Sequence, residues 1–292
     1  MRQYFYEYYA TDRDCAFDEA KKVKVRSLKA LSGCSLMAGS ILHRFAALLI
    51  DKKRSLSSAW VMKTALTSFD GAVSFSRDPR SQAHRLREKY PPQELLEYAY
   101  EDWDGDEASG QARAGLERAL ACLCGNSPVG RLVATLRSSE AHIEKRVSKL
   151  MLAEWPIGGQ IDVLLVEPSN VRVLDWKLGG AEYGADSLQL YIYSWFAEVY
   201  LGVPRSSVSG QRVFLGDGVI ETPQVVTDEV ANVGRARLIQ DVELMEELHR
   251  YGQEGREEAF RPCNIEGICR RCNYRAICQG AKLRPCSNAI SA

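Results

Sequence analysis

Two short runs rich in β-branched residues, 161–166 and 171–176, constrain this chain more than any other feature of its sequence. The four residues 167–170, Glu-Pro-Ser-Asn, separate the runs, and turn-forming residues in that place predict an antiparallel β-hairpin. With a four-residue turn, Asp162 falls directly opposite Asp175, with about 5 Å between the two Cβ atoms. Lys177 stands two residues beyond Asp175 and therefore points to the same face of the sheet.

Two carboxylates and an amine on one patch of an otherwise apolar hairpin are costly unless something compensates their charges. A divalent cation does so, because oxygen ligands at this separation suit Mg²⁺ or Mn²⁺. Such an ion stabilises charge that develops on a phosphate and lowers the pKa of a bound water, which Lys177 can orient or deprotonate. The competing interpretation is an exposed strand face with an ordinary Asp–Lys pair. The matched position of Asp162 and the glycines at 158 and 159 favour the metal site.

Four motifs stand along the chain in this order: Gly39-Ser-Ile-Leu-His43, Gly159-Gln-Ile-Asp162, Asp175-Trp-Lys177 and Gln189-Leu-Tyr-Ile-Tyr193. Their order and spacing resemble those of RecB-type nucleases of the PD-(D/E)XK superfamily, over roughly residues 15–280. One residue departs from that pattern, since Asp175 stands where these nucleases often have glutamate. The shorter side chain preserves the charge and is expected to retune the preference for the metal.

The resemblance implies a role for each matching residue. His43, Asp162, Asp175 and the backbone carbonyl of Trp176 would ligate the metal, and Lys177 would act on the attacking water. The family also has a glutamate on the strand before the hairpin, for which Glu144 is our candidate, although Glu140 is close in register. Gln189 and Tyr193 lie one helical turn apart and would contact DNA or steady the site, and Tyr193 has a plain core position as its alternative.

The fold expected from this resemblance is an α/β restriction-endonuclease-like core with a small mixed sheet. We expect helices over residues 110–125, 128–137, 186–200 and 228–250, and further strands within 213–226. The predicted organisation has an N-terminal helical part of the core (1–44), a helical insertion (45–138), the nuclease core (139–255) and a cysteine-clipped C-terminal cap (256–292).

The C-terminal segment contains Cys269, Cys272 and Cys278 in a C-x₂-C-x₅-C pattern, which brings thiolates to one metal centre but leaves a fourth ligand to be found. CRISPR-associated exonucleases and helicase–nuclease relatives have this spacing together with an upstream cysteine, and bind an iron–sulfur cluster. The resemblance therefore implies a [4Fe–4S] cluster held by the three cysteines and Cys15, with Cys34 and Cys263 as other candidates for the fourth ligand. A zinc ion at the same cysteines is the alternative.

The overall composition and net charge exclude few classes of function. The formal net charge of the 292 residues is zero, so charge alone predicts no nucleic-acid partner. No apolar stretch reaches the roughly 18 residues of a membrane span, and the N-terminus does not resemble a signal peptide. We therefore expect a cytoplasmic protein without a membrane partner, in which nine cysteines serve as buried thiols or metal ligands rather than disulfides.

The sequence thus predicts an Mg²⁺- or Mn²⁺-dependent deoxyribonuclease. Exonuclease action on single strands is favoured, because cluster-bearing relatives work mostly on DNA ends. Two other functions compete with this prediction: a catalytically silent DNA-binding module, and an iron–sulfur redox or regulatory protein. A role as subunit of a CRISPR adaptation or recombination complex is compatible with cleavage. No P-loop pattern is present, so any unwinding of DNA must come from a helicase partner.

Overall fold

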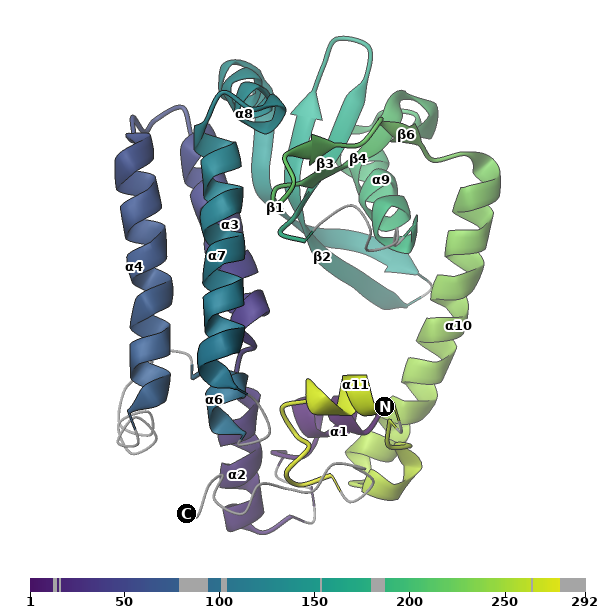
Figure 1. Cartoon of the computed structure of the whole chain (residues 1–292). Coiled ribbons are helices and arrows are strands. Elements are labelled where there is room, and N and C mark those ends of the chain that lie inside the picture. The colour runs from purple at the N-terminus through teal and green to yellow at the C-terminus, as the bar shows by residue number, and fades with distance from the viewer. Residues whose placement is uncertain are drawn as a thin grey trace. The chain divides into compact units, whose positions relative to one another are not determined.

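Figure 1 presents the computed structural model of the chain, which describes residues 1–12, 15, 17–78, 94–100, 104–152, 154–179, 187–263 and 265–278. Contacts divide the chain into two compact units. The sheet unit comprises Ala38–Ser68 and Ala112–Val242, and the cap unit comprises Met1–Met37, Phe69–Gln111 and Glu243–Ala292. This division does not test the domain boundaries predicted from the sequence, which stay a prediction.

The sheet unit is built on a curled mixed sheet in the order β1-β2-β3-β4-β5, with β6 also paired to β4. Its strands are β1 (Glu140–Leu152), β2 (Trp155–Val166), β3 (Val171–Lys177), β4 (Val208–Phe214), β5 (Val219–Ile220) and β6 (Gln224–Val225). The first three strands pair antiparallel, whereas β3 and β4 are parallel. A parallel pair needs a crossover connection, and α9 (Ser187–Leu201) with the 3-10 turn η1 (Arg205–Ser207) provides it.

The predicted hairpin is confirmed in its strands, its turn and its register. Glu167 N–H donates to the carbonyl of Asn170 at 2.8 Å and closes the four-residue turn. The ladder then runs from the pair Val166–Val171 to the pair Val163–Leu174. Asp162 and Asp175 come next on their strands, at positions that continue this register just beyond the last ladder pair.

Helix α9 covers one face of the sheet (Figure 1), because its apolar side chains meet every second residue of the neighbouring strands. Val171, Val173 and Val208 form this core together with Phe196 and Ala197 of the helix. The odd-numbered residues of β3 that face α9 at the start of the strand continue to Asp175 and Lys177. The packing that makes the core therefore also brings α9 over the polar end of the strand.

The helices outside the sheet also follow the sequence pattern. They are α3 (Cys34–Ile50), α4 (Ser58–Arg77), α7 (Gly105–Cys124), α8 (Pro128–Ser138) and α10 (Asp228–Gln253). At the start of helix α8, Ser127 accepts a hydrogen bond from Gly130 N–H, and Pro128 takes the first helical position. Both residues favour the start of a helix, because the serine side chain satisfies an N–H that lacks a partner in the first turn and proline has no N–H to leave unpaired. The helices predicted at 110–125, 128–137, 186–200 and 228–250 are all confirmed.

The cap unit has an aromatic core between the N-terminal helix and the C-terminal segment. Its own elements are α1 (Arg2–Tyr8), α2 (Glu19–Lys29), α6 (Leu96–Ala99), η2 (Glu257–Ala259) and α11 (Glu266–Arg270). Phe5 and Tyr6 of α1 are fully buried, as are Phe260 and Tyr274 of the C-terminal segment. Residues more than 250 positions apart in sequence therefore share one core, which fixes the cysteine segment against α1.

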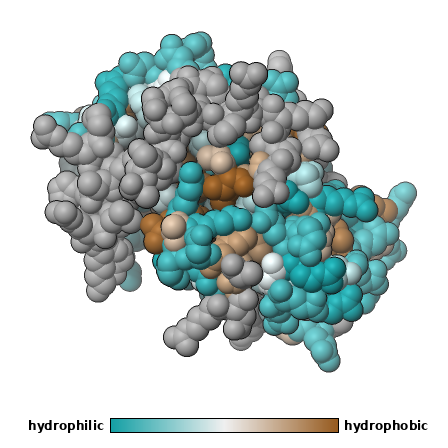
Figure 2. Space-filling model, turned by 90° about the horizontal axis from the view of Figure 1, so that it is seen from below, coloured by the Kyte–Doolittle hydropathy of each residue, from teal (hydrophilic) through white to brown (hydrophobic). Residues whose placement is uncertain are grey.

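Strands and helices together form a mixed α/β fold around a small mixed sheet, as predicted. Among the described residues no single helix has the length and apolar character that crossing a membrane requires, although the bent pair α7 and α8 meets these criteria jointly. Figure 2 displays one face, on which a small hydrophobic area is visible beside hydrophilic residues.

Candidate metal centre

Asp162 lies at the point where the ladder between β2 and β3 stops. Its Oδ2 accepts a hydrogen bond from the backbone N–H of Trp176 at 2.8 Å, so a side chain takes the place of the next ladder bond. Its Oδ1 lies 3.1 Å from Nδ1 of His43 on α3. Only 6% of Asp162 is exposed. The carboxylate is therefore held from both sides in one orientation.

Glu144 reaches the same place from β1. The pairs Ile143–Val163 and Lys145–Ile161 flank it, so it stands opposite Asp162 in the register. Its backbone has φ of 50°, an unusual value for a non-glycine residue, and Glu144 itself has no partner in the ladder that the structure describes.

The side chain of Glu144 is only partly satisfied. Gln160 donates a hydrogen bond to its Oε2, whereas Oε1 is buried and has no hydrogen-bond partner. The alternative Glu140 pairs with Val166 at the other end of the hairpin. The geometry thus favours Glu144 over Glu140 at the site.

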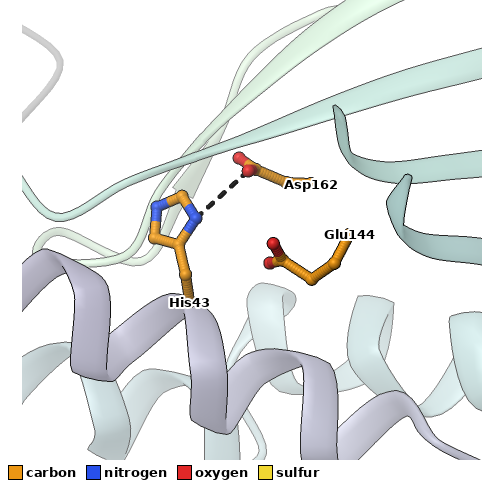
Figure 3. A group of neighbouring side chains, drawn as sticks. All are labelled: His43, Glu144 and Asp162. Carbon is orange, nitrogen blue, oxygen red and sulfur yellow. Dashed lines mark hydrogen bonds and ion pairs between the residues drawn. The ribbon is translucent and has the colours of Figure 1, made fainter. Parts of the chain in front are cut away.

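Figure 3 shows His43, Glu144 and Asp162 converging from α3, β1 and β2. One ligand atom of each side chain lies within 4.8 Å of the ligand atoms of the other two. Two carboxylates and one imidazole can hold a divalent cation such as Mn²⁺ or Mg²⁺, with water completing the coordination. The buried, unpartnered oxygen of Glu144 fits this role, because burying a carboxylate oxygen without a partner is costly.

Asp175 and Lys177 form a second group next to this one. Lys177 Nζ lies 2.8 Å from Asp175 Oδ2 and donates to Gln189 Oε1 at 2.9 Å. Gln189 Nε2 donates to Asp175 Oδ1 at 3.1 Å and to the hydroxyl of Tyr193 at 2.9 Å. Asp175 is 2% exposed, whereas 36% of the Lys177 side chain is exposed. The amine is thus oriented by two partners and remains accessible to substrate.

The electrostatics indicate an excess of negative charge held away from water. Burial alone would lower the pKa of His43, but its hydrogen bond to Asp162 and the charge of Asp162 outweigh that effect and raise it. Burial and the charge of Asp162 raise the pKa of Glu144. Burial also raises the pKa of Asp175, against the opposing effect of Lys177. A bound cation would favour the charged forms of Glu144 and Asp175 and the neutral form of His43.

The residues named from the sequence are therefore brought together in part. His43, Asp162 and Glu144 share one group, and Asp175 lies beside it in contact with Lys177 and Gln189. Trp176 contributes its N–H to Asp162, and a role of its carbonyl stays a prediction. Sequence reasoning missed Gln160, the donor to Glu144. The alternation of side chains along a strand could have found it, because it stands two residues before Asp162.

The cysteines of the C-terminal segment surround a separate cavity in the cap unit, of about 280 Å³. Cys269, Cys272 and Cys278 line it, together with Cys263 and the ring of Tyr274. Among the residues that the structure describes, no three cysteine sulfurs lie within 4.8 Å of one another. Cys15 is buried in the aromatic core and is not among the lining residues.

The family model described as the PD-(D/E)XK nuclease superfamily matches residues 6–279 of the chain. The match spans both compact units and includes the metal-centre residues as well as the cysteine segment. Searches of curated proteins and of solved structures found no match.

Proposed function

The chain belongs to the PD-(D/E)XK nuclease superfamily, and we propose that it is a DNA exonuclease that hydrolyses single strands with Mg²⁺ or Mn²⁺. Nuclease activity with a divalent ion follows from the family and from the acidic group at the sheet. The observation that carries the proposal is the convergence of His43, Glu144 and Asp162 beside an oriented lysine.

Each side chain has a distinct part in this mechanism. A bound divalent ion would supply an activated water and stabilise the charge that develops on the phosphate. Asp162 is fixed for coordination by Trp176 N–H and His43, and the free oxygen of Glu144 faces the same point. As the ammonium, Lys177 orients the attacking water and attracts the phosphate, and only as the neutral amine would it take the proton of that water.

Gln189 and Tyr193 support this lysine in our proposal rather than reading DNA. Gln189 bonds to both Lys177 and Asp175, and Tyr193 in turn bonds to Gln189. A side chain that holds two others in place acts through them, so Gln189 is a positioning residue. The core alternative for Tyr193 is compatible with this, because its ring packs against the apolar core of α9 and the sheet.

The cysteine cavity fits an iron–sulfur cluster better than zinc. Zn–S bonds of about 2.3 Å in a tetrahedron place the sulfurs about 3.8 Å apart, whereas no three described cysteine sulfurs lie within even 4.8 Å. A single water needs only about 10–15 Å³, so a cavity of about 280 Å³ is far larger than one ion requires. We therefore propose a [4Fe–4S] cluster with a structural role, as in the RecB-like iron–sulfur nucleases.

A nuclease assay tests the proposal. Linear and circular single-stranded DNA are incubated with the purified protein and Mg²⁺ or Mn²⁺, beside Lys177→Ala and the control Lys63→Ala, an exposed lysine on α4. We expect degradation of the linear strand, resistance of the circle, and a loss of activity of about 100-fold or more in Lys177→Ala only. Cleavage of both substrates would replace the exonuclease assignment by an endonuclease. Binding without cleavage would indicate a silent DNA-binding module.

The sequence contains no P-loop pattern, and this bears on which protein partners the chain would need. Without a P-loop pattern it cannot unwind duplex DNA by itself. We propose that it acts on strands that a helicase or a CRISPR or recombination complex exposes. Adding duplex DNA with and without a helicase to the same assay distinguishes this from action on duplex ends.

A further inference from the structure

A second lysine of the sheet unit lies next to the metal centre in sequence. Lys145 follows Glu144 on β1, and its Nζ lies 4.2 Å from the centre of the Tyr200 ring on α9. Within the described part of the chain, its ammonium forms neither an ion pair nor a hydrogen bond. Lys177, by contrast, is paired with Asp175. Lys145 is thus a positive charge that the described carboxylates leave unneutralised.

The backbone of Glu144 accounts for the direction in which Lys145 points. The ring of His142 also meets the Tyr200 ring, edge-on and with 5.9 Å between the two centroids. Residues three positions apart in a regular strand point to opposite faces, so the alternation must reverse between His142 and Lys145. Glu144 reverses it, because its φ of 50° is left-handed. The residue that carries a metal ligand therefore also turns the next side chain towards α9.

The ring of Tyr200 supports Lys145 from a fixed position. It stacks on the buried ring of Phe196, with the centroids 5.6 Å apart and 6° between the planes. Tyr200 is nevertheless 40% exposed, and Lys145 is partly exposed, so a ligand can reach the ammonium from solvent. A cation–π contact restricts the lysine side chain but leaves its three N–H donors available.

This ammonium and the ammonium of Lys177 both lie against α9. Lys177 donates to Gln189, which in turn donates to the hydroxyl of Tyr193. Tyr200 stands seven residues after Tyr193, almost two helical turns, so the two tyrosines share one face of α9 about 10 Å apart. Two cations are therefore spaced along one helix beside the acids of the metal centre. The phosphates of a nucleic-acid strand are charges of opposite sign in a similarly extended row.

We propose that Lys145 binds a backbone phosphate of the substrate strand beside the metal centre, with Tyr200 holding the lysine in place. An ammonium binds phosphate as a point charge, and such contacts position a strand without reading its bases. This inference rests on the proposed function, because it takes a nucleic acid as the substrate.

The test measures the binding of a labelled oligodeoxythymidine strand in EDTA, which prevents cleavage, at several salt concentrations. Lys145→Met keeps a flexible apolar chain over the Tyr200 ring without its charge. Lys145→Arg keeps the charge, and Lys63→Met removes an exposed lysine of α4 as the control. Each phosphate contact to a single strand contributes about 0.7 to the slope of log affinity against log salt concentration.

We expect Lys145→Met to lower this slope by about 0.7, so that its affinity is about 5-fold below that of the wild type at about 0.1 M salt and equal near 1 M. Lys145→Arg should keep the steeper slope, as should Lys63→Met. With Mg²⁺ or Mn²⁺, Lys145→Met should raise KM for the strand about 5-fold and lower kcat by less than about 2-fold, because the contact is made before the chemical step.

An unchanged salt slope in a folded Lys145→Met protein would overturn the inference, as would an equal change in Lys63→Met. A purely structural role of Lys145 would lower the melting temperature and leave the slope as it is. Lys145→Gln replaces the methionine variant if thermal unfolding shows that the latter does not fold. Wild-type protein that neither binds nor cleaves the strand would refute the proposed function together with this inference. Cleavage by wild type with an unchanged slope in the variant refutes only the role of Lys145.

Discussion

Replacing Glu144 by glutamine should make the metal-free protein more stable. Glu144 and Asp162 place carboxylate oxygens within 4.8 Å of each other, and Glu144 Oε1 is buried without a hydrogen-bond partner. Glutamine keeps the shape of the side chain and can accept the hydrogen bond from Gln160, but it removes one negative charge. The substitution therefore tests whether the carboxylates repel each other in the absence of a cation.

The magnitude follows from the distance. Two unit charges 4.8 Å apart interact with about 0.9 kcal/mol in water and about 3.5 kcal/mol at an effective dielectric constant of 20. Glu144 is partly exposed, so we expect a gain of about 1–3 kcal/mol. For a unit of this size about 1 kcal/mol shifts the melting temperature by about 2–4 °C, which predicts an increase of about 2–12 °C.

Thermal unfolding with EDTA and with Mg²⁺ or Mn²⁺ measures this effect. The control is Glu140→Gln, which changes an exposed glutamate on the same strand. With metal at about 100 times its dissociation constant, the wild type should gain about 2.7 kcal/mol, and Glu144→Gln clearly less because it lacks a ligand. Without metal, Glu144→Gln should thus be more stable than the wild type. Added metal should stabilise the variant less than it stabilises the wild type.

The pH dependence has a defined sign. Burial and the charge of Asp162 raise the pKa of Glu144 in the folded protein. A carboxyl group with a raised folded pKa destabilises the fold above that pKa, and this penalty disappears as the pH falls through it. The gap between variant and wild type should therefore close towards acidic pH. A metal-free Glu144→Gln that melts at or below the wild type at neutral pH would refute the reasoning.

Three further predictions concern other contacts of the chain. Gln189→Leu should lower nuclease activity by about 10- to 100-fold without abolishing metal binding, because Lys177 loses one of its two partners and keeps only Asp175. Tyr193→Phe should cost less, and equal losses in a steady-state nuclease assay would contradict this ranking. Glu97 accepts hydrogen bonds from Cys34 N–H at 2.9 and 3.0 Å at the start of α3, so Glu97→Ala should cost about 1–2 kcal/mol in urea unfolding, whereas the exposed Glu243→Ala should be neutral. Removing divalent ions with EDTA should abolish nuclease activity, and adding back Mg²⁺ or Mn²⁺ should restore it; activity that persists without metal would exclude the proposed mechanism.

Local patterns account for the part of the fold that the sequence predicts. The hairpin follows from two β-branched runs around Pro168 and Asn170, because turn residues and alternation act over only a few positions. The opposition of Asp162 and Asp175 follows from that turn length alone. The helix over 187–201 follows in the same way from its apolar spacing.

The rest depends on contacts between distant segments, which no local pattern encodes. Glu144 reaches the site through a left-handed backbone conformation within a strand, and alternation along β1 gives no signal for it. His43 arrives from a helix more than 100 residues away from Asp162. The cysteine cavity is similar, because the spacing of the tail cysteines indicates a metal centre, whereas the cavity that they line together with Tyr6 requires the tertiary packing of α1.

The three acids of this site occupy one row across β1, β2 and β3, and the fold compensates them unequally. Asp175 has Lys177 and Gln189, and Asp162 has a backbone N–H and an imidazole. In a purely structural ion-pair network, each carboxylate would be paired in this way and none would be left over. The Oδ2 of Asp175 has no hydrogen bond but is paired with Lys177, whereas the buried Oε1 of Glu144 has neither a hydrogen bond nor an ion pair among the described contacts. A buried carboxylate oxygen without a partner lowers the stability of the fold unless a bound cation compensates it. The position of Glu144 Oε1 beside the other acids of the site therefore argues for a cation-binding site rather than a solvated strand face.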